Sequence, residues 1–301
     1  MDSKLVFKSE QDVFELLTHW GEQQPLVRLM LLTSSRAIPH HAAVDVFSDY
    51  DVILALRDVH PFHESRAWLA AFGQVLVMYQ DPLETRDGCL RSANVVQFED
   101  GLKIDFNLWE VEYFKGVVAA EPLPDEFDAG YRVLLDKDHL TDGLKPPTYQ
   151  AYIPKPPTGG RYAQVVENFF LDATYVAKLL WRDDLMAAKH LLDHFMKQEG
   201  LLQMLEWHLE TDHHWSVKPG LYGRRLKVWL RPDLWAELEG TYAGSGLEEN
   251  WEALSRSIAL FRKAAVEVGE RLGYAYPQDM DQRLCAYLQK VKDMPREAAG
   301  G

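Results

Sequence analysis

The sequence predicts an α+β protein in which a small mixed-sheet domain is followed by an all-helical C-terminal domain. Three observations predict this order. Residues 1–141 alternate short helical and strand patterns, residues 142–160 are rich in proline and glycine, and residues 161–295 repeat apolar side chains at helical spacing. We therefore expect two domains joined by a connector at 142–160, with a flexible tail at 296–301.

The N-terminal domain is expected to contain short helices and strands. Apolar residues follow a helical period in some segments and form short continuous or alternating runs in others. Asp100-Gly101 is a two-residue turn signal and predicts a hairpin over residues 92–111. We expect helices on one face of a mixed sheet, with helices at 11–22 and 63–74 and strands at 25–35, 49–56 and 74–82.

The C-terminal domain is predicted to be helical throughout. The connector before it contains five prolines and three glycines between residues 141 and 162, which neither a helix nor a central strand tolerates. Three long amphipathic segments follow. We expect helices over 162–184, over 185–210 with a break near Gly200, and over 249–274 with its end at Gly273.

The composition is that of an ordinary globular protein and excludes several classes. A net charge of −14 disfavours nonspecific nucleic-acid binding, and an acidic surface suits cationic partners. Two cysteines, Cys89 and Cys285, provide neither a disulfide framework nor a cysteine zinc site. No signal peptide and no membrane-spanning run is evident, so we expect a cytoplasmic protein, and no protein partner is inferred.

Two aspartates stand at the start of an apolar run in the stretch "FSDYDVILALRD". Because side chains two residues apart in a strand share a face, Asp49 and Asp51 are expected side by side. A later strand alternates in the same way, with one face made of Lys103, Asp105, Asn107 and Trp109. If the two strands are neighbours, Asp105 meets the first two acids.

Three carboxylates on one face would repel one another, and their pKa values would rise unless a cation joined them. Mg²⁺ is the natural cation for an all-oxygen ligand set. The alternative is that the aspartates are ordinary turn acids, because D-x-D alone is a common pattern.

The segment before these acids favours the metal interpretation. "MLLTSSRA" is an apolar strand that ends in Ser34, Ser35 and Arg36. Small hydroxyl residues at such a position allow backbone N–H groups to face a phosphate, and Arg36 adds a positive charge. A phosphate cradle next to three acids is the equipment of phosphoryl or nucleotidyl transfer.

This arrangement resembles the DNA polymerase beta-type nucleotidyltransferase superfamily, and within it the streptomycin (aminoglycoside 6-) adenylyltransferases. Besides "FSDYDV", the similar segments are "TYVAKLLWRDDL", "SVKPGLYGRRLKVWL", "LWAELEGTY" and "AVEVGERLGYAYP". The resemblance covers residues from about 10 to about 290. It implies that residues 1–141 form the nucleotidyltransferase domain and residues 161–295 a helical substrate-binding domain.

One departure from the family pattern falls in the phosphate turn. The family reads Gly-Ser-Arg where this chain reads Ser34-Ser35-Arg36. If φ is positive there, the serine strains the turn by about 1–3 kcal/mol. Alternatively, the Ser34 hydroxyl donates a hydrogen bond that glycine lacks.

The resemblance implies roles for the N-terminal acids and the turn. Asp49 and Asp51 hold Mg²⁺, with two ions expected, and Ser35 together with Ser34 and Arg36 binds the phosphates of ATP, the co-substrate. Asp105 is either a third metal ligand or the base that accepts the proton of the acceptor hydroxyl.

Further candidates lie near the helical domain. By resemblance, Lys178 contacts the nucleotide phosphates or a domain interface. The carboxylates expected to hold a guanidinium-bearing substrate are Glu167, Asp172, Asp183 and Asp184, each of which is otherwise a solvated helix-face charge. Trp109 either walls the acceptor pocket or packs in the core.

The histidines do not indicate a metal site. His190 and His194 are one helical turn apart, but no third ligand at suitable spacing is evident. We expect these residues, and the pairs His40-His41 and His213-His214, to be surface or capping residues. No serine protease triad or Gly-rich nucleotide motif is present.

The implied activity is transfer of AMP from Mg·ATP to a hydroxyl of an aminoglycoside such as streptomycin, with release of pyrophosphate and inactivation of the antibiotic. The acceptor is expected in a cleft between the two domains. Two alternatives remain. The acceptor is a different small hydroxylated molecule or a protein, or the chain is a nucleotide- or ligand-binding relative that no longer catalyses.

Overall fold

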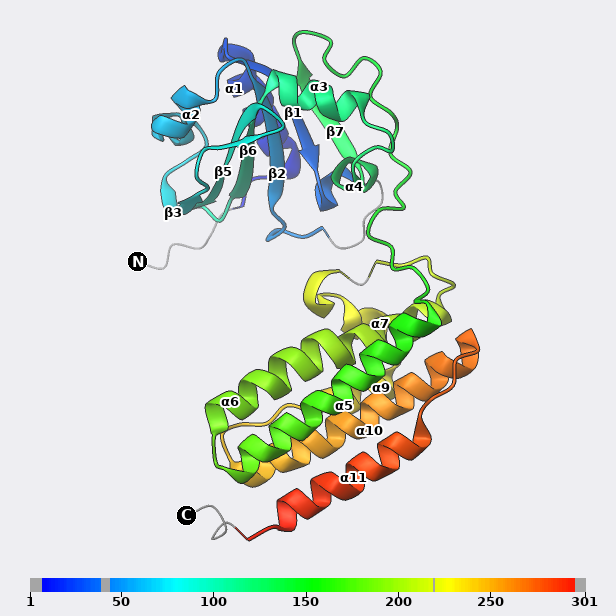
Figure 1. Ribbon diagram of the computed structural model, residues 1–301. Helices are drawn as coiled ribbons and strands as arrows, with labels where there is room; N and C mark the ends of the chain where they lie inside the picture. The colour runs from blue at the N-terminus through cyan, green and yellow to red at the C-terminus, as the bar shows by residue number, and fades with distance from the viewer. Residues whose placement is uncertain (1–6, 39–43, 219, 296–301) are drawn as a thin grey trace. The chain divides into compact units, whose positions relative to one another are not determined.

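The computed structural model describes residues 7–38, 44–218 and 220–295 (Figure 1). The chain divides into two compact units, Met1–Tyr152 and Ile153–Gly301. This division falls inside the segment 142–160 that the sequence suggests as a connector. The expected tail at 296–301 and the His40-His41 pair lie outside the described residues.

The first unit contains one mixed sheet whose strand order is β3-β5-β6-β2-β1-β7, with β4 paired to β5. Strands β2 and β6 are parallel, and the other pairs along this order are antiparallel. The strands are β1 (Val27–Thr33), β2 (Tyr50–Leu56), β3 (Val75–Gln80), β4 (Glu84–Arg86), β5 (Cys89–Phe98), β6 (Lys103–Glu110) and β7 (Tyr131–Asp136). The predicted hairpin over 92–111 is confirmed as β5 and β6.

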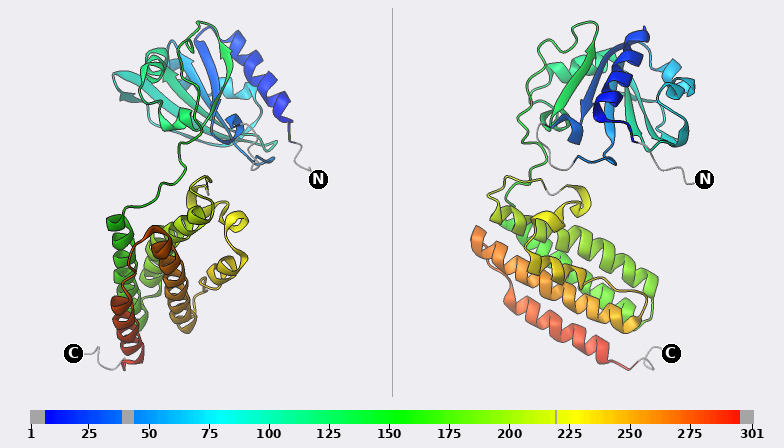
Figure 2. Two further views of the ribbon diagram at one scale, coloured as in Figure 1. Left: turned by 90° about the vertical axis from the view of Figure 1, so that its right-hand side faces the viewer. Right: turned by 180° about the vertical axis from the view of Figure 1, so that it is seen from behind.

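Helices cover both faces of this sheet, so the prediction of helices on one face is wrong. Helix α1 (Glu10–Gln23) and the short helix α2 (His60–Glu64) pack with the face that carries Val52 and Phe106. Helices α3 (Val111–Ala119) and α4 (Asp125–Asp128) pack with the face that carries Ile53 and Trp109. Figures 1 and 2 show α1 and α3 on opposite sides of the strands.

The alternation of side chains places the candidate acids on the second of these faces. In β2, Tyr50, Val52 and Leu54 point into the α1 side, so Asp51 shares the α3 side with Ile53. In β6, Ile104 and Phe106 point into the α1 side, which leaves Asp105 on the α3 side.

Several elements of the first unit differ from the predicted ones, and strand β4 and helices α3 and α4 were not predicted. Strand β7 was not predicted, yet it pairs with β1 from Leu29↔Asp136 to Thr33↔Tyr131. The single helix expected at 63–74 is instead the pair α2 and a 3₁₀ turn at Ala67–Ala71.

The second unit is helical. Its helices are α5 (Gly159–Trp181), α6 (Leu185–Lys189), the π-helical η3 (His190–Leu201), α7 (Leu202–Asp212), α8 (Leu226–Trp229), α9 (Pro232–Glu239), α10 (Leu247–Leu272) and α11 (Gln278–Asp293). Helix α5 packs against η3, α10 and α11, and α10 also packs against α7. As predicted, α10 ends at Gly273, which adopts φ 75°.

The break expected near Gly200 is absent, because α6, η3 and α7 follow one another without interruption (Figure 1). Gly200 serves packing instead. A Cβ at this position would lie 2.8 Å from Phe169, which stacks on Phe261 with ring centroids 3.8 Å apart. The glycine therefore permits close approach of η3 to α5. Among the described residues, no helix has the length and apolarity needed to cross a membrane.

Candidate active site

The register of the two parallel strands brings the predicted acids together. Asp51 of β2 is the direct cross-strand partner of Asp105 of β6. Asp49 lies two residues before Asp51, immediately upstream of β2. The three carboxylates therefore meet at the end of the sheet where β2 and β6 begin, as the sequence predicts.

A lysine lies between these acids. Lys103 Nζ donates to Asp49 Oδ2 at 2.6 Å and to both Asp105 oxygens at 3.0 and 3.1 Å. Sequence reasoning placed Lys103 on the face of Asp105 but gave it no role. The signal was available, because a cation two residues before a site carboxylate shares its face.

The electrostatics of the site reflect crowding of like charges. Burial, together with the neighbouring Asp105 and Asp49, raises the pKa of Asp51 to about 6. Burial and Asp49 also raise the pKa of Asp105, against the lowering effect of Lys103. Burial opposes the charge on Lys103, but its contacts with both carboxylates outweigh burial and raise its pKa. The carboxylates therefore hold more negative charge than one ammonium neutralises.

The oxygen donors at this site suit a hard cation such as Mg²⁺. In the described part of the chain, no three His, Cys, Asp or Glu side chains are gathered closely enough to hold a metal as they stand. Lys103 accounts for this locally, because its ammonium lies between Asp49 and Asp105 where a cation would bind. The ligand types therefore fit Mg²⁺, while the arrangement requires Lys103 to move aside.

The turn before the acids has the conformation that the family glycine would favour. Ser34 adopts φ 64° and ψ −154° and precedes the 3₁₀ turn Ser35–Ala37. A hydrogen bond from the Ser34 side chain also lowers the pKa of Asp51, against burial and the neighbouring acids. Both expectations for Ser34, strain and a donated hydrogen bond, are therefore met. The serine connects the phosphate turn to the carboxylates.

Comparing glycine and alanine at position 34 separates these two effects. Both substitutions remove the hydrogen bond to Asp51, but only glycine relieves the positive φ. We expect Ser34→Gly to be more stable than Ser34→Ala by about 1 kcal/mol in urea unfolding. Equal stabilities of the two variants would show that the turn does not hold this conformation.

Arg36 is held by the loop that precedes β2. Its guanidinium donates to the carbonyl oxygens of Asp45, Ser48 and Asp49 at 2.7–3.2 Å. It also pairs with Glu10 at 3.1 Å, and only 6% of its side chain is exposed. Most of the guanidinium N–H groups are thus engaged, and Arg36 fixes the loop that ends at Asp49.

A cavity of about 320 Å³ opens beside the carboxylates. Arg36, Tyr50 and Lys103 line it, together with Phe7 and Phe47, whose rings meet edge to face at 5.3 Å. Asp51 and Asp105 are not among the residues that line it. The acids therefore form an open site at the strand ends and not a pocket floor.

The remaining predicted site residues are Trp109 in β6 and a group of charged residues on or near α5. Trp109 is 3% exposed and packs against Tyr113 and Phe127, which is the packing alternative. Lys178 lies 5.3 Å from the ring centroid of Tyr175. The four carboxylates lie on or just after α5; Asp172 is half-buried, and the exposed ones are Glu167, Asp183 and Asp184. Burial and the nearby Glu199 raise the pKa of Asp172.

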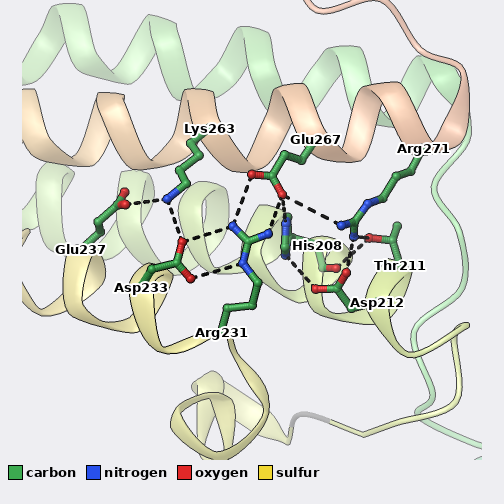
Figure 3. Close-up of polar contacts among 9 residues, drawn as sticks. All are labelled: His208, Thr211, Asp212, Arg231, Asp233, Glu237, Lys263, Glu267 and Arg271. Atoms are coloured by element: carbon green, nitrogen blue, oxygen red, sulfur yellow. Dashed lines mark hydrogen bonds and ion pairs between the residues drawn. The ribbon is translucent and has the colours of Figure 1, made fainter.

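A charge network that sequence reasoning missed joins α7, α9 and α10 (Figure 3). His208 is fully buried and bonds Glu267 at 2.6 Å, and Arg231 donates to the same carboxylate at 3.0 Å. Lys263 joins Asp233 and Glu237 at 2.9 and 2.6 Å. The exposed His190 and His194 match the predicted surface role.

Comparison with known proteins identifies the family. The family model described as "Streptomycin adenylyltransferase" matches residues 7–291. The chain belongs to this family. It is 30% identical over 289 residues to an aminoglycoside 6-adenylyltransferase of Bacillus subtilis (strain 168), with 94% of this chain and 98% of that protein covered. A Campylobacter jejuni aminoglycoside 6-adenylyltransferase is 26% identical, with 95% and 96% covered.

Among solved structures, an aminoglycoside 6-adenyltransferase from Bacillus subtilis matches with a TM-score of 0.47 and 27% identity, covering 95% of this chain and 100% of that one. As a streptomycin adenylyltransferase family member, the chain is an enzyme of the aminoglycoside 6-adenylyltransferase type, as the sequence predicts. Family membership also implies ATP and an aminoglycoside as substrates.

Proposed function

We propose that this enzyme transfers AMP from Mg·ATP to a hydroxyl of an aminoglycoside such as streptomycin and releases pyrophosphate. The observation that carries the proposal is the pairing of Asp51 with Asp105 beside Asp49, at the end of a sheet next to the Ser34-Ser35 turn. Three acids and a phosphate-facing turn position a triphosphate and stabilise its transfer. The relatives named above supply the acceptor class.

Asp49, Asp51 and Asp105 would hold Mg²⁺, which when bound neutralises phosphate charge and aligns the α-phosphate. Asp105 faces the same side as Asp51, and Lys103 contacts it through both oxygens. We assign Asp105 the role of accepting the proton of the attacking hydroxyl, because it lies directly across from Asp51, and burial together with Asp49 raises the pKa of its carboxyl. Ser34 and Ser35 bind the terminal phosphates.

The direct test is pyrophosphate release from Mg·ATP, with and without streptomycin, followed by mass spectrometry of the product. The proposal expects pyrophosphate that depends on streptomycin and a product heavier by one AMP. A panel of other hydroxylated acceptors identifies the acceptor if streptomycin fails. ATP turnover without any adenylylated product would contradict transfer.

A second candidate function rests on Ser34. A serine at φ 64° is strained and places a Cβ where the family has glycine. If the side chain crowds the triphosphate, the chain binds a nucleotide without transferring it. Tight ATP binding without product over many hours, corrected by Ser34→Gly, would support this candidate.

Lys103 provides a test of the metal proposal. Replacing it with methionine removes contacts to Asp49 and Asp105 and leaves the acids unbalanced, so the metal-free protein should lose about 1 kcal/mol of stability. Mg²⁺ should restore this loss, so the increase in melting temperature caused by Mg²⁺ should be larger in Lys103→Met than in wild type. Lys115→Met, which removes only the surface pair with Glu112, is the control. An equal Mg²⁺ effect in all three proteins would argue against binding at these acids.

A further inference from the structure

Several buried or half-buried carboxylates of the helical unit have cationic partners. Asp281, 4% exposed, accepts two hydrogen bonds from Arg262. Asp193 lies between Lys189 and Lys197, each with an N–O distance of 2.7 Å. Glu267 accepts from Arg231 and His208 (Figure 3). This pattern is expected, because a buried charge without a partner is costly.

Glu206 and Glu210 of α7 depart from this pattern. They are four residues apart and thus neighbours on one face of the helix. Glu210 is 0% exposed, and its Oε1 has no hydrogen-bond partner among the described residues. Its other oxygen accepts only from the segment that follows α7, from Val217 N at 3.4 Å and from the Ser216 backbone.

Glu206 is half-buried and faces Glu210. Burial and the charge of Glu210 raise the pKa of Glu206 to about 7. Within residues 7–38, 44–218 and 220–295, its carboxylate forms no ion pair or hydrogen bond with another residue. The fold thus holds the two acids within reach of each other's charge.

His208 and two cationic side chains at α8 contact other groups. His208, between the two glutamates in sequence, contacts Glu267 and Asp212. Arg225 lies 5.8 Å from the ring centroid of Trp229, and Lys227 lies 5.3 Å from that of Trp235. Glutamine at either position would avoid the repulsion at nearly the same volume. Such a local cost of like charges is typical of a ligand site.

The chemistry of this pair selects its ligand. Among the described residues, neither glutamate belongs to a group of three His, Cys, Asp or Glu side chains that could hold a metal. A planar guanidinium pairs with a carboxylate through two parallel hydrogen bonds, and a second negative charge behind the first strengthens the pairing. We propose that Glu206 and Glu210 bind a guanidinium group of the acceptor, with Glu206 in contact and Glu210 behind it. This inference rests on the proposed function, in which streptomycin supplies two guanidinium groups.

The experiment uses Glu206→Gln and Glu210→Gln in the full chain. Both changes keep side-chain volume, so folding should be retained. We expect the KM for streptomycin to rise about 10- to 100-fold in Glu206→Gln, while kcat and the KM for ATP change less than about threefold. Glu210→Gln should shift the same constant in the same direction.

Glu252→Gln is the matched control, because Glu252 lies on the exposed side of α10 and pairs with Arg256 at 3.0 Å. An aminoglycoside that carries ammonium groups but no guanidinium should be affected less than streptomycin. A merely structural role would lower melting temperature and kcat and leave the streptomycin KM unchanged. That result, or equal losses in Glu252→Gln, would overturn the inference.

A binding measurement separates this inference from the proposed function. The increase in melting temperature caused by streptomycin is recorded without ATP in wild type and in Glu206→Gln. An increase that wild type shows and the variant lacks supports the site even if no AMP is transferred. Adenylylation that proceeds with an unchanged streptomycin KM in Glu206→Gln overturns the site and leaves the proposed function intact.

Discussion

Replacing Asp51 with asparagine is expected to lower kcat/KM for adenylyl transfer by about 1000-fold or more, and Asp49→Asn should act similarly. Asp51 is the acid most enclosed by its neighbours, with Asp105 directly across the strand pair and Ser34 bonded to it. Asparagine keeps the shape but removes the charge that would hold Mg²⁺ and the triphosphate. Steady-state pyrophosphate release measures the loss.

Stability distinguishes this loss from misfolding. Because burial and repulsion raise the pKa of Asp51, an uncharged side chain should leave the melting temperature unchanged or higher. Asp58→Asn, beyond the other end of β2, is the matched control; Asp58 is exposed and contacts His60. A wild-type rate in Asp49→Asn or Asp51→Asn would remove these acids from the proposed site.

Replacing Asp281 with alanine is expected to cost the helical unit about 3 kcal/mol of unfolding free energy. Asp281 joins α11 to α10 through Arg262 and also accepts from Tyr276 Oη at 2.8 Å. Its removal leaves the Arg262 guanidinium and the Tyr276 hydroxyl without their acceptor. Urea unfolding measures the loss.

The pH dependence of this effect has a definite sign. Burial raises the pKa of Asp281, but Arg262 and Tyr276 outweigh it, and the result lies below the ordinary value of 3.8. A lowered pKa means that the stabilisation is present above the unfolded value and is lost as pH falls through the folded value. The penalty of Asp281→Ala should therefore be full at neutral pH and shrink only in strong acid. Asp279→Ala, on the exposed side of α11, should cost little at any pH.

The sequence predicts the relative positions of the three aspartates, because side-chain direction in a strand follows a fixed period. Strand alternation places Asp49 with Asp51, and the pairing of β2 with β6 places Asp105 beside them. The hydrogen-bond partners of Arg36 depend on the loop at 45–49, because carbonyl oxygens of this loop accept from its guanidinium. The conformation of a loop follows no such period. The sequence therefore suggests for Arg36 only the role that its charge and its position beside the turn indicate, which is phosphate binding.

The helices and strands show the same difference between features that a local sequence pattern marks and features that depend on distant contacts. Helix α10 and the β5–β6 hairpin were predicted because caps and turns mark them locally. Strand β7 was missed because its pairing with β1 is a nonlocal contact that no local pattern marks. The predicted break at Gly200 was wrong because close packing against Phe169, and not a turn, requires that glycine.

The pair Glu206 and Glu210 of α7 also has a consequence for the thermal stability of the protein in the presence of cationic ligands. Because the two carboxylates repel each other, a molecule that supplies a cation is stabilised in two ways, by its own binding and by relief of the repulsion between Glu206 and Glu210. Thermal denaturation of the unmodified enzyme across a library of cationic metabolites and antibiotics should therefore rank candidate acceptors without an activity assay. Compounds that raise the melting temperature of wild type but not of Glu206→Gln would be those that bind at this pair of glutamates.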